Sequence, residues 1–225
     1  RSYSVTGVQT CALPIFTCDD NGTAANVTVS CYGQVNAAGG STTIFTETMG
    51  STGTNGASIA SWESGNSFDN DSFTMAGTGD MRNTSVSDYT GASGSFNVML
   101  NASSEYFLIS EINTTSYSSI ALNVGIRKGT ISENGSTLAI QVSSDGTNWT
   151  TLSYSMPTGT GTAKWYYVSP TGTIPSASNL RLRFTSSSTV EFRIDDIKLT
   201  GTTASSTPTI TLSASTLSGF TYYAG

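Results

Sequence analysis

Near the end of the chain, over residues 190–199, hydrophobic and polar residues alternate. Phe192 and Ile194 are flanked by charged or polar residues, which is the period-two pattern of a half-buried strand. After Asp195 and Asp196 the apolar residues resume one position out of phase. This slip predicts a β-bulge at the two aspartates, because an unbroken strand would turn the following apolar residues toward solvent.

Further segments upstream have strand patterns and are separated by turn residues. The most regular is Ser119–Arg127, in which alternate residues are apolar. Asp145 and Gly146 predict a tight hairpin turn, and the simplest interpretation of Trp149 is that it packs beneath this turn. The expected strands are residues 44–49, 97–100, 106–109, 119–127, 138–142, 149–152, 165–168, 180–184 and 190–199.

The segments between these strands are rich in Gly and Ser and contain no helical periodicity. The runs at residues 77–85 and 89–95 are expected to be compact loops, because Gly permits positive φ and close approach of the backbone. Many short strands with turn residues between them predict an all-β protein. We therefore expect a jelly-roll β-sandwich over residues 43–201.

The N-terminal region has a different character. Residues 5–15 resemble the translation of a widely used sequencing-library adapter, so we interpret residues 1–16 as an assembly artefact. Residues 17–42 are expected to be an upstream remnant followed by a linker. Cys18 and Cys31 lie in this remnant and are either joined in a disulfide or present as two free thiols.

The C-terminal region has the composition expected at a domain boundary. Residues 202–208 are rich in Thr, Ser and Pro, which is typical of a linker. Residues 209–225 alternate again and are expected to begin another β-domain. The chain is therefore expected to be part of a longer multidomain protein.

Composition narrows the function. Charged residues make up 11% of the chain, and Ser, Thr, Asn and Gly supply the polar surface, which is typical of secreted or cell-surface proteins. A net charge of −6 argues against a nucleic-acid partner, which requires a basic surface. We expect no insertion into a membrane. The absence of His excludes Ser-His-Asp and Cys-His catalysis and zinc binding through imidazole.

Five short motifs occur in order along the chain: Phe45-Thr-Glu47, Arg82 followed by Tyr89-Thr-Gly91-Ala-Ser-Gly94, Ile112-Asn113-Thr114, Val142-Ser-Ser-Asp145-Gly146-x-x-Trp149, and Arg193-Ile194-Asp195-Asp196-Ile197. Together they resemble galactose-binding-like jelly-roll modules, akin to carbohydrate-binding and MAM-like domains of secreted bacterial surface proteins. Residues 208–220 resemble the opening of the immunoglobulin-like repeats that often follow such modules. The resemblance implies a non-catalytic module whose partner is a polysaccharide or a cell-surface glycan.

The same resemblance implies a structural calcium ion between the first strand and the last. The matching positions are Glu47 and Asp195 or Asp196. Carboxylate oxygens suit Ca²⁺, which takes six to eight oxygen ligands, so backbone carbonyls would complete the shell. The alternative is that the two aspartates only charge an edge strand against aggregation.

Sugars stack on aromatic faces and are oriented by a few polar groups in concave sites. The candidate ligand-binding residues are Asp80, Arg82, Tyr89, Trp165 and Tyr166. Neighbouring residues in a strand face opposite sides, so Trp165 and Tyr166 cannot both lie in the core. The alternative is that these aromatic residues are buried and that Asp80 and Arg82 only brace the loop before Tyr89.

Three functions follow from these observations. The preferred hypothesis is a non-catalytic carbohydrate- or surface-binding module, which contacts flanking domains of the same polypeptide. The second is a structural spacer without a ligand. The third is a glycan-acting hydrolase, which would need two carboxylates placed across a cleft, and the sequence gives no reason to pair any two of its glutamates.

Overall fold

The structure is a computed structural model that describes residues 40–159 and 163–203. The predictions for residues 1–16, for nearly all of residues 17–42 and for residues 204–225 fall outside this part of the chain. Cys18 and Cys31 also lie outside this part, so the disulfide and the two free thiols both stay open.

Two antiparallel sheets make up the domain. The six-stranded sheet has the order β3 (Asp80–Arg82), β4 (Asn97–Leu100), β11 (Phe192–Thr203), β6 (Tyr117–Lys128) and β9 (Trp165–Val168), with β1 (Ser41–Glu47) also paired to β11. The five-stranded sheet has the order β2 (Thr74–Gly77), β5 (Tyr106–Ile112), β10 (Leu180–Ser186), β7 (Leu138–Ser143) and β8 (Thr150–Leu152).

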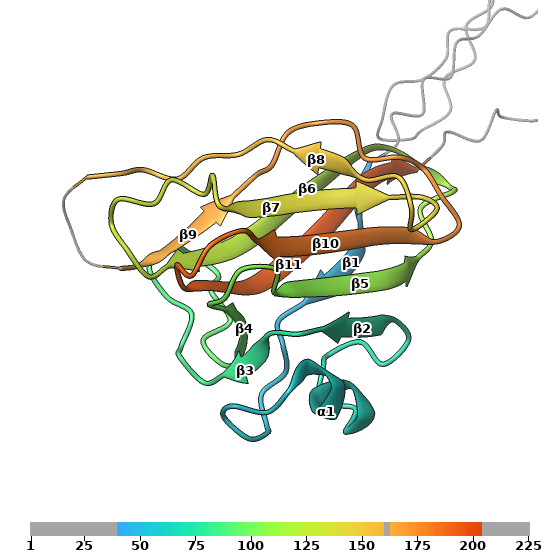
Figure 1. Cartoon of the computed structure of the whole chain (residues 1–225). Helices are drawn as coiled ribbons and strands as arrows, with labels where there is room; N and C mark the ends of the chain where they lie inside the picture. The colour runs from blue at the N-terminus through green and yellow to red at the C-terminus, as the bar shows by residue number, and fades with distance from the viewer. Residues whose placement is uncertain (1–39, 160–162, 204–225) are drawn as a thin grey trace, which may run out of the picture. The chain divides into compact units, whose positions relative to one another are not determined.

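The two sheets pack face to face as two layers (Figure 1). Most connections cross from one sheet to the other, as when β4 is followed by β5 and β5 by β6. Alternation of sheets along an antiparallel chain is the jelly-roll arrangement. The predicted all-β sandwich is confirmed.

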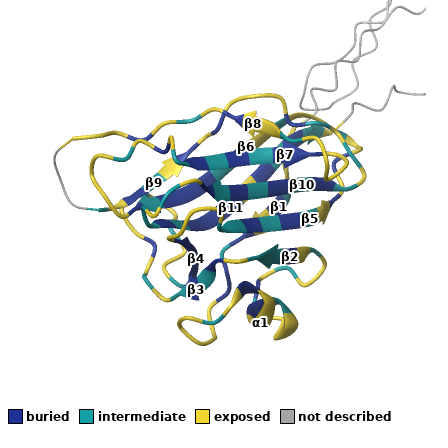
Figure 2. Ribbon diagram, viewed as in Figure 1, coloured by how far each residue is buried: buried dark blue, intermediate teal, exposed yellow. Residues whose placement is uncertain are grey.

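The hydrophobic core lies between the sheets. Strands of the five-stranded sheet alternate between buried and partly exposed residues, as Figure 2 shows for β7 and β10. Phe107 of β5 and Phe184 of β10 are fully buried and stack with their ring centroids 6.2 Å apart. Alternate residues of each strand therefore fill the core, which leaves the residues between them for the outer surface.

Two short strands and a helix lie where the sequence predicted only turns and loops. Helix α1 (Ile59–Ser64) begins after Ser58, whose side chain accepts a hydrogen bond from the backbone N of Ser61. It buries Ile59 and Trp62. A helix of six residues is too short to show a periodic pattern, so the end cap and packing against the sheets stabilise it.

The first strand differs from its prediction at both ends. It covers Ser41–Glu47 instead of residues 44–49. Met49 and Gly50 have φ angles of 59° and 73°, which are incompatible with a strand. The last strand continues to Thr203 and pairs with the start of β1, so that Ser41 lies opposite Thr202.

Lys128, at the end of β6, is buried. Its Nζ donates hydrogen bonds to the carbonyl oxygens of Ile131 at 3.2 Å, of Glu133 at 2.6 Å and of Pro157. The ammonium group thereby joins the segment that follows β6 to the segment that follows β8. Among the described residues, no helix is long and apolar enough to cross a membrane.

Candidate functional site

Asp195 and Asp196 lie where β11 changes its partner. On one side, β4 pairs with β11 as far as Ile194, and β1 pairs with it from Ile197 onward. On the other side, the register against β6 shifts after Asp195, and Asp196 has a φ of 47°. The predicted β-bulge is confirmed. Because β11 is an interior strand, the alternative that the aspartates charge an exposed edge is wrong.

Glu47 ends β1 opposite the far side of this bulge, and its side chain is fully buried. Oε1 accepts hydrogen bonds from the backbone N of Met49 at 2.8 Å and of Asp69 at 3.0 Å. Oε2 accepts one from Nδ2 of Asn70 at 3.3 Å. Glu47 therefore fixes the turn that contains Asp69 and Asn70 against the end of the first strand.

The two aspartates hold residues 83–96, which we call the covering loop. Asp196 Oδ2 accepts hydrogen bonds from the hydroxyl of Tyr89 and from the backbone N of Ser93, the latter at 3.2 Å. Asp195 Oδ2 accepts one from Oγ of Ser93 at 3.2 Å. The covering loop is thus fastened to the bulge by both carboxylates.

Glu47, Asp195 and Asp196 form what we call the acidic cluster. Burial raises the pKa of Glu47 to about 7, although the hydrogen bond from the backbone N of Asp69 opposes this effect. Burial, followed by the adjacent Asp196, also raises the pKa of Asp195 well above its ordinary value. The ion pairs within the described residues are Arg82 with Asp80 and Arg127 and Arg193 with Glu191, so none compensates the acidic cluster.

The donor chemistry of the acidic cluster fits a hard cation. Buried carboxylates without a compensating charge are costly, and oxygen ligands are those that Ca²⁺ prefers. Glu47 also contributes to the raised pKa of Asp195, so the two carboxylates interact. However, the described residues contain no group of three or more His, Cys, Asp and Glu side chains placed to hold a metal ion. Backbone carbonyls and water would have to supply most ligands.

The predicted ligand-binding residues are not brought together. Asp80 and Arg82 form a two-bonded ion pair on β3, with Arg82 Nε 2.7 Å from Asp80 Oδ1 and Nη2 2.5 Å from Oδ2. Tyr89 instead lines a separate pocket of about 260 Å³ beside the bulge. Its ring stacks on Tyr167 at 5.0 Å, and Asp196 and Lys198 also line this pocket.

Trp165 drops out of the predicted ligand-binding set. Its side chain is only 3% exposed, because the covering loop lies over it. Nε1 donates a hydrogen bond to the carbonyl oxygen of Ser85 at 3.2 Å, and its backbone N donates one to Asp88 Oδ2 at 2.9 Å. Tyr166 faces the opposite side, as predicted, and packs against the core between the ammonium groups of Lys128 and Lys164.

The outer face of the five-stranded sheet carries an aromatic and cationic group that the sequence analysis did not single out. The guanidinium of Arg183 on β10 lies over the ring of Trp149, 3.8 Å from its centroid. Gln141 on β7 lies beside Arg183, and its Oε1 accepts hydrogen bonds from Nε at 3.2 Å and Nη2 at 2.8 Å. Trp149 is partly exposed, so it does not lie buried beneath the hairpin turn.

A pocket of about 410 Å³ opens at this group. We call it the Trp149 pocket; its lining combines aromatic, aliphatic, hydroxyl and guanidinium groups. The residues that line it are Ser104, Tyr106, Leu108, Gly146, Trp149, Arg183 and Thr185. They come from the segment before β5, from β5 and β10, and from the connection between β7 and β8. The predicted hairpin is confirmed, but its connection covers residues 144–149 and is longer than a tight turn.

No protein-family model matches the sequence, and no curated protein sequence does. Solved structures with a similar fold include the xylan-binding CBM22-1 domain of Paenibacillus barcinonensis Xyn10C, at 14% identity and a TM-score of 0.44, covering 75% of this chain and 100% of that one. The CBM22-1 and GH10 modules of a Clostridium thermocellum xylanase are similar at 17% identity and a TM-score of 0.43, covering 71% of this chain and 28% of that one.

A third similar structure is the K2 adhesin domain of Lys-gingipain, at 16% identity and a TM-score of 0.42, covering 69% of this chain and 96% of that one. This chain therefore spans less than a third of the xylanase structure but nearly all of the two isolated domains. All three TM-scores are below 0.5, and the function proposed below rests on residues of this chain.

Proposed function

We propose that this domain is a non-catalytic carbohydrate-binding module of an exported multidomain protein and that it binds its glycan in the Trp149 pocket. The observation that carries the proposal is the stack of Arg183 on Trp149, with Gln141 holding the guanidinium in place. The pocket adds a second aromatic residue, Tyr106, and the hydroxyl of Thr185.

This combination suits a sugar for physical reasons. The apolar face of a sugar ring packs on an aromatic ring, while its hydroxyl groups need hydrogen-bond partners fixed in direction. The strands of a sheet hold Arg183 and Gln141 rigidly, and the stack limits the conformations of the guanidinium before a ligand arrives. Less conformational entropy is then lost on binding.

A hydrolase is less well supported. Glycoside hydrolysis ordinarily uses two carboxylates on either side of the scissile bond. Within the described residues, the Trp149 pocket is lined by no carboxylate and the pocket at Tyr89 by Asp196 alone. A spacer without a ligand would have no use for an aromatic and cationic group preformed on an open sheet face.

The test is binding of soluble polysaccharides, including xylan, pectins and galactan, measured by affinity electrophoresis and calorimetry on the isolated domain. Trp149→Ala should abolish or strongly weaken the binding that the wild-type domain shows. Tyr167→Ala is the matched control, because Tyr167 is 42% exposed on the other sheet and its loss should leave the affinity unchanged. No binding to any polysaccharide, or equal binding by Trp149→Ala, would refute the proposal.

We also propose that the acidic cluster binds a structural Ca²⁺. Support comes from the burial of Glu47 and Asp195, the lack of an ion pair to either among the described residues, and the oxygen-only donor set. Glu47 and either Asp195 or Asp196 would supply the carboxylate ligands, backbone carbonyls and water would supply the others, and the ion would neutralise the buried charge. The unfolding midpoint should rise with calcium and fall with EGTA, and Glu47→Gln should lose this response; a midpoint indifferent to calcium contradicts the site.

A further inference from the structure

We propose that the glycan bound by the Trp149 pocket is acidic, a polysaccharide of hexuronic acids whose carboxylate is held by Arg183. This inference rests on the proposed function and specifies the class of ligand. It starts from the charge of the pocket, in which Arg183 is the only charged side chain among the lining residues. The chain as a whole carries a net charge of −6, so the charge of this pocket has the opposite sign to that of the protein.

Arg183 differs from the arginines of the other sheet in its partner. Arg82, Arg127 and Arg193 each form an ion pair with a carboxylate. Within the described residues Arg183 forms no such pair, and its hydrogen bonds go to the neutral amide of Gln141. The full positive charge of Arg183 is therefore available to a ligand.

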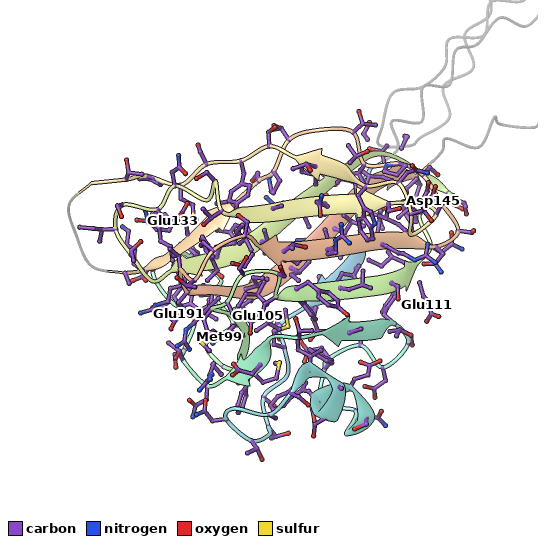
Figure 3. All side chains as sticks on the ribbon, in the orientation of Figure 1. Met99, Glu105, Glu111, Glu133, Asp145 and Glu191 are labelled. Atoms are coloured by element: carbon purple, nitrogen blue, oxygen red, sulfur yellow. The ribbon has the colours of Figure 1, made fainter. Side chains whose placement is uncertain are left out.

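The carboxylates around this face are engaged elsewhere. Figure 3 labels Glu105 and Glu111 near opposite ends of β5 and Asp145 in the β7–β8 hairpin. Glu105 Oε2 accepts hydrogen bonds from the backbone N of Asn101 and Ala102 at 2.6 and 2.9 Å. Glu111 Oε2 accepts one from Oγ1 of Thr74 at 2.9 Å.

Of these three carboxylates, that of Asp145 accepts the most hydrogen bonds. Its two oxygens accept hydrogen bonds from Thr147 N at 2.8 Å and from Asn148 N and Nδ2, each at 2.7 Å. These bonds hold the pKa of Asp145 well below its usual range, with the bond from the Asn148 side chain contributing most. The carboxylate of Asp145 serves the turn, and among the described residues it forms no ion pair with Arg183.

The geometry of the guanidinium suits a planar anion. Arginine has five N–H donors, and Gln141 uses one on Nε and one on Nη2. Nη1 donates no hydrogen bond to any of the described residues, so two adjacent nitrogens retain free donors for a two-bonded contact with a carboxylate. Stacking on Trp149 fixes the plane in which that contact forms.

A second cation lies on the same strand. Arg181 precedes Arg183 by two residues, so both face outward, roughly 7 Å apart along β10. Arg181 also forms no ion pair among the described residues, and its single hydrogen bond there is a long one, 3.5 Å, to the carbonyl oxygen of Asn179. Two unpaired arginines in a row favour a polymer with repeated negative charges over an isolated acidic sugar.

The experiment compares polygalacturonate with fully methyl-esterified pectin, which has the same backbone without the charge. The wild-type domain should bind polygalacturonate at least tenfold more tightly, and this preference should shrink with added salt, because screening weakens exposed charge pairs. Arg183→Gln should lose roughly ten- to hundredfold in affinity for polygalacturonate and little for the ester. Lys164→Gln, which removes an exposed charge near the other sheet, is the matched control and should change neither.

The outcomes separate this inference from the function on which it rests. Equal binding of the charged and esterified polymers, with both lost in Trp149→Ala, would overturn the acidic ligand and support a carbohydrate-binding module for neutral glycans. A sulfated galactan bound more tightly than polygalacturonate would also overturn the hexuronic acid. Binding of no polymer would overturn both proposals.

Discussion

Gly125 is the position at which a single methyl group should reveal how firmly the covering loop is held. It lies in β6 opposite Asp195, and a Cβ at this position would lie 2.2 Å from the hydroxyl of Tyr89 and 3.2 Å from the carbonyl oxygen of Asp195. Its φ is not in the positive range, so the backbone itself accepts any residue. In a strand, Gly→Ala is ordinarily stabilising by about 0.5–1 kcal/mol; here we expect the opposite sign.

The magnitude follows from what Tyr89 must give up to make room. Its hydroxyl donates a hydrogen bond to Asp196, and bonds to charged groups are worth about 1.5–3 kcal/mol. Its ring stacks on Tyr167, and such pairs contribute about 0.5–1.5 kcal/mol. Displacing the ring should therefore destabilise the domain by about 2–4 kcal/mol, which lowers the unfolding midpoint by roughly 5–15 °C.

Urea and thermal unfolding of four proteins would measure this: wild type, Gly125→Ala, Tyr89→Phe and the double variant. Tyr89→Phe removes the hydroxyl with which the new methyl collides, so the double variant should be more stable than the sum of the single changes predicts, by at least about 1 kcal/mol. A Gly125→Ala variant as stable as wild type, or strictly additive effects, would refute the account of the covering loop.

Two further predictions concern buried charge. In EGTA, the wild-type domain should lose stability as pH rises, because Glu47 has a pKa of about 7 in the folded state against an ordinary 4.5, so the folded state binds the proton more tightly. The loss in the free energy of unfolding is of the order of 3 kcal/mol, and it should be smaller in Glu47→Gln. Unfolding midpoints at a series of pH values would measure it. Equal slopes for both proteins would contradict this. Lys128→Met should lower the free energy of unfolding by about 2–3 kcal/mol, because three carbonyl oxygens lose their hydrogen-bond donor. It should also make the segments that follow β6 and β8 sensitive to limited proteolysis. An unchanged digestion pattern would contradict this role of Lys128.

Local patterns in the sequence were sufficient for most of the strands and for the bulge, but not for the short strands β2 and β3. The slip after Asp195 could be recognised because strand period two leaves one residue too many, and Asp145-Gly146 could be recognised because few residue pairs suit a tight turn. Helix α1 could not, since its stability depends on packing of Trp62 that local residues do not reveal.

The candidate site depended on information that lies outside any local pattern. Trp149 and Arg183 are far apart in sequence, and their contact requires the order β5-β10-β7-β8, which alternation alone does not determine. Arg181 and Arg183 occupy outward positions of an alternating strand, but polar residues are ordinary on a solvated sheet face, so these positions alone did not mark a site. Alternation showed only that Trp165 and Tyr166 face opposite sides, and it could not show that the covering loop buries Trp165.

The antiparallel pairing of β1 with β11 has a mechanical consequence. Ser41 and Thr202 are register partners, so the domain is entered and left at the same end of one strand pair. Tension applied across these two residues would open the pair like a zipper, one hydrogen bond at a time, instead of shearing all of them together. The opening would run along β1 to Glu47, whose side chain is tied to the turn at Asp69 and lies at the acidic cluster. A cation bound there would resist further separation of β1 from β11, so calcium would set the force at which the domain unfolds.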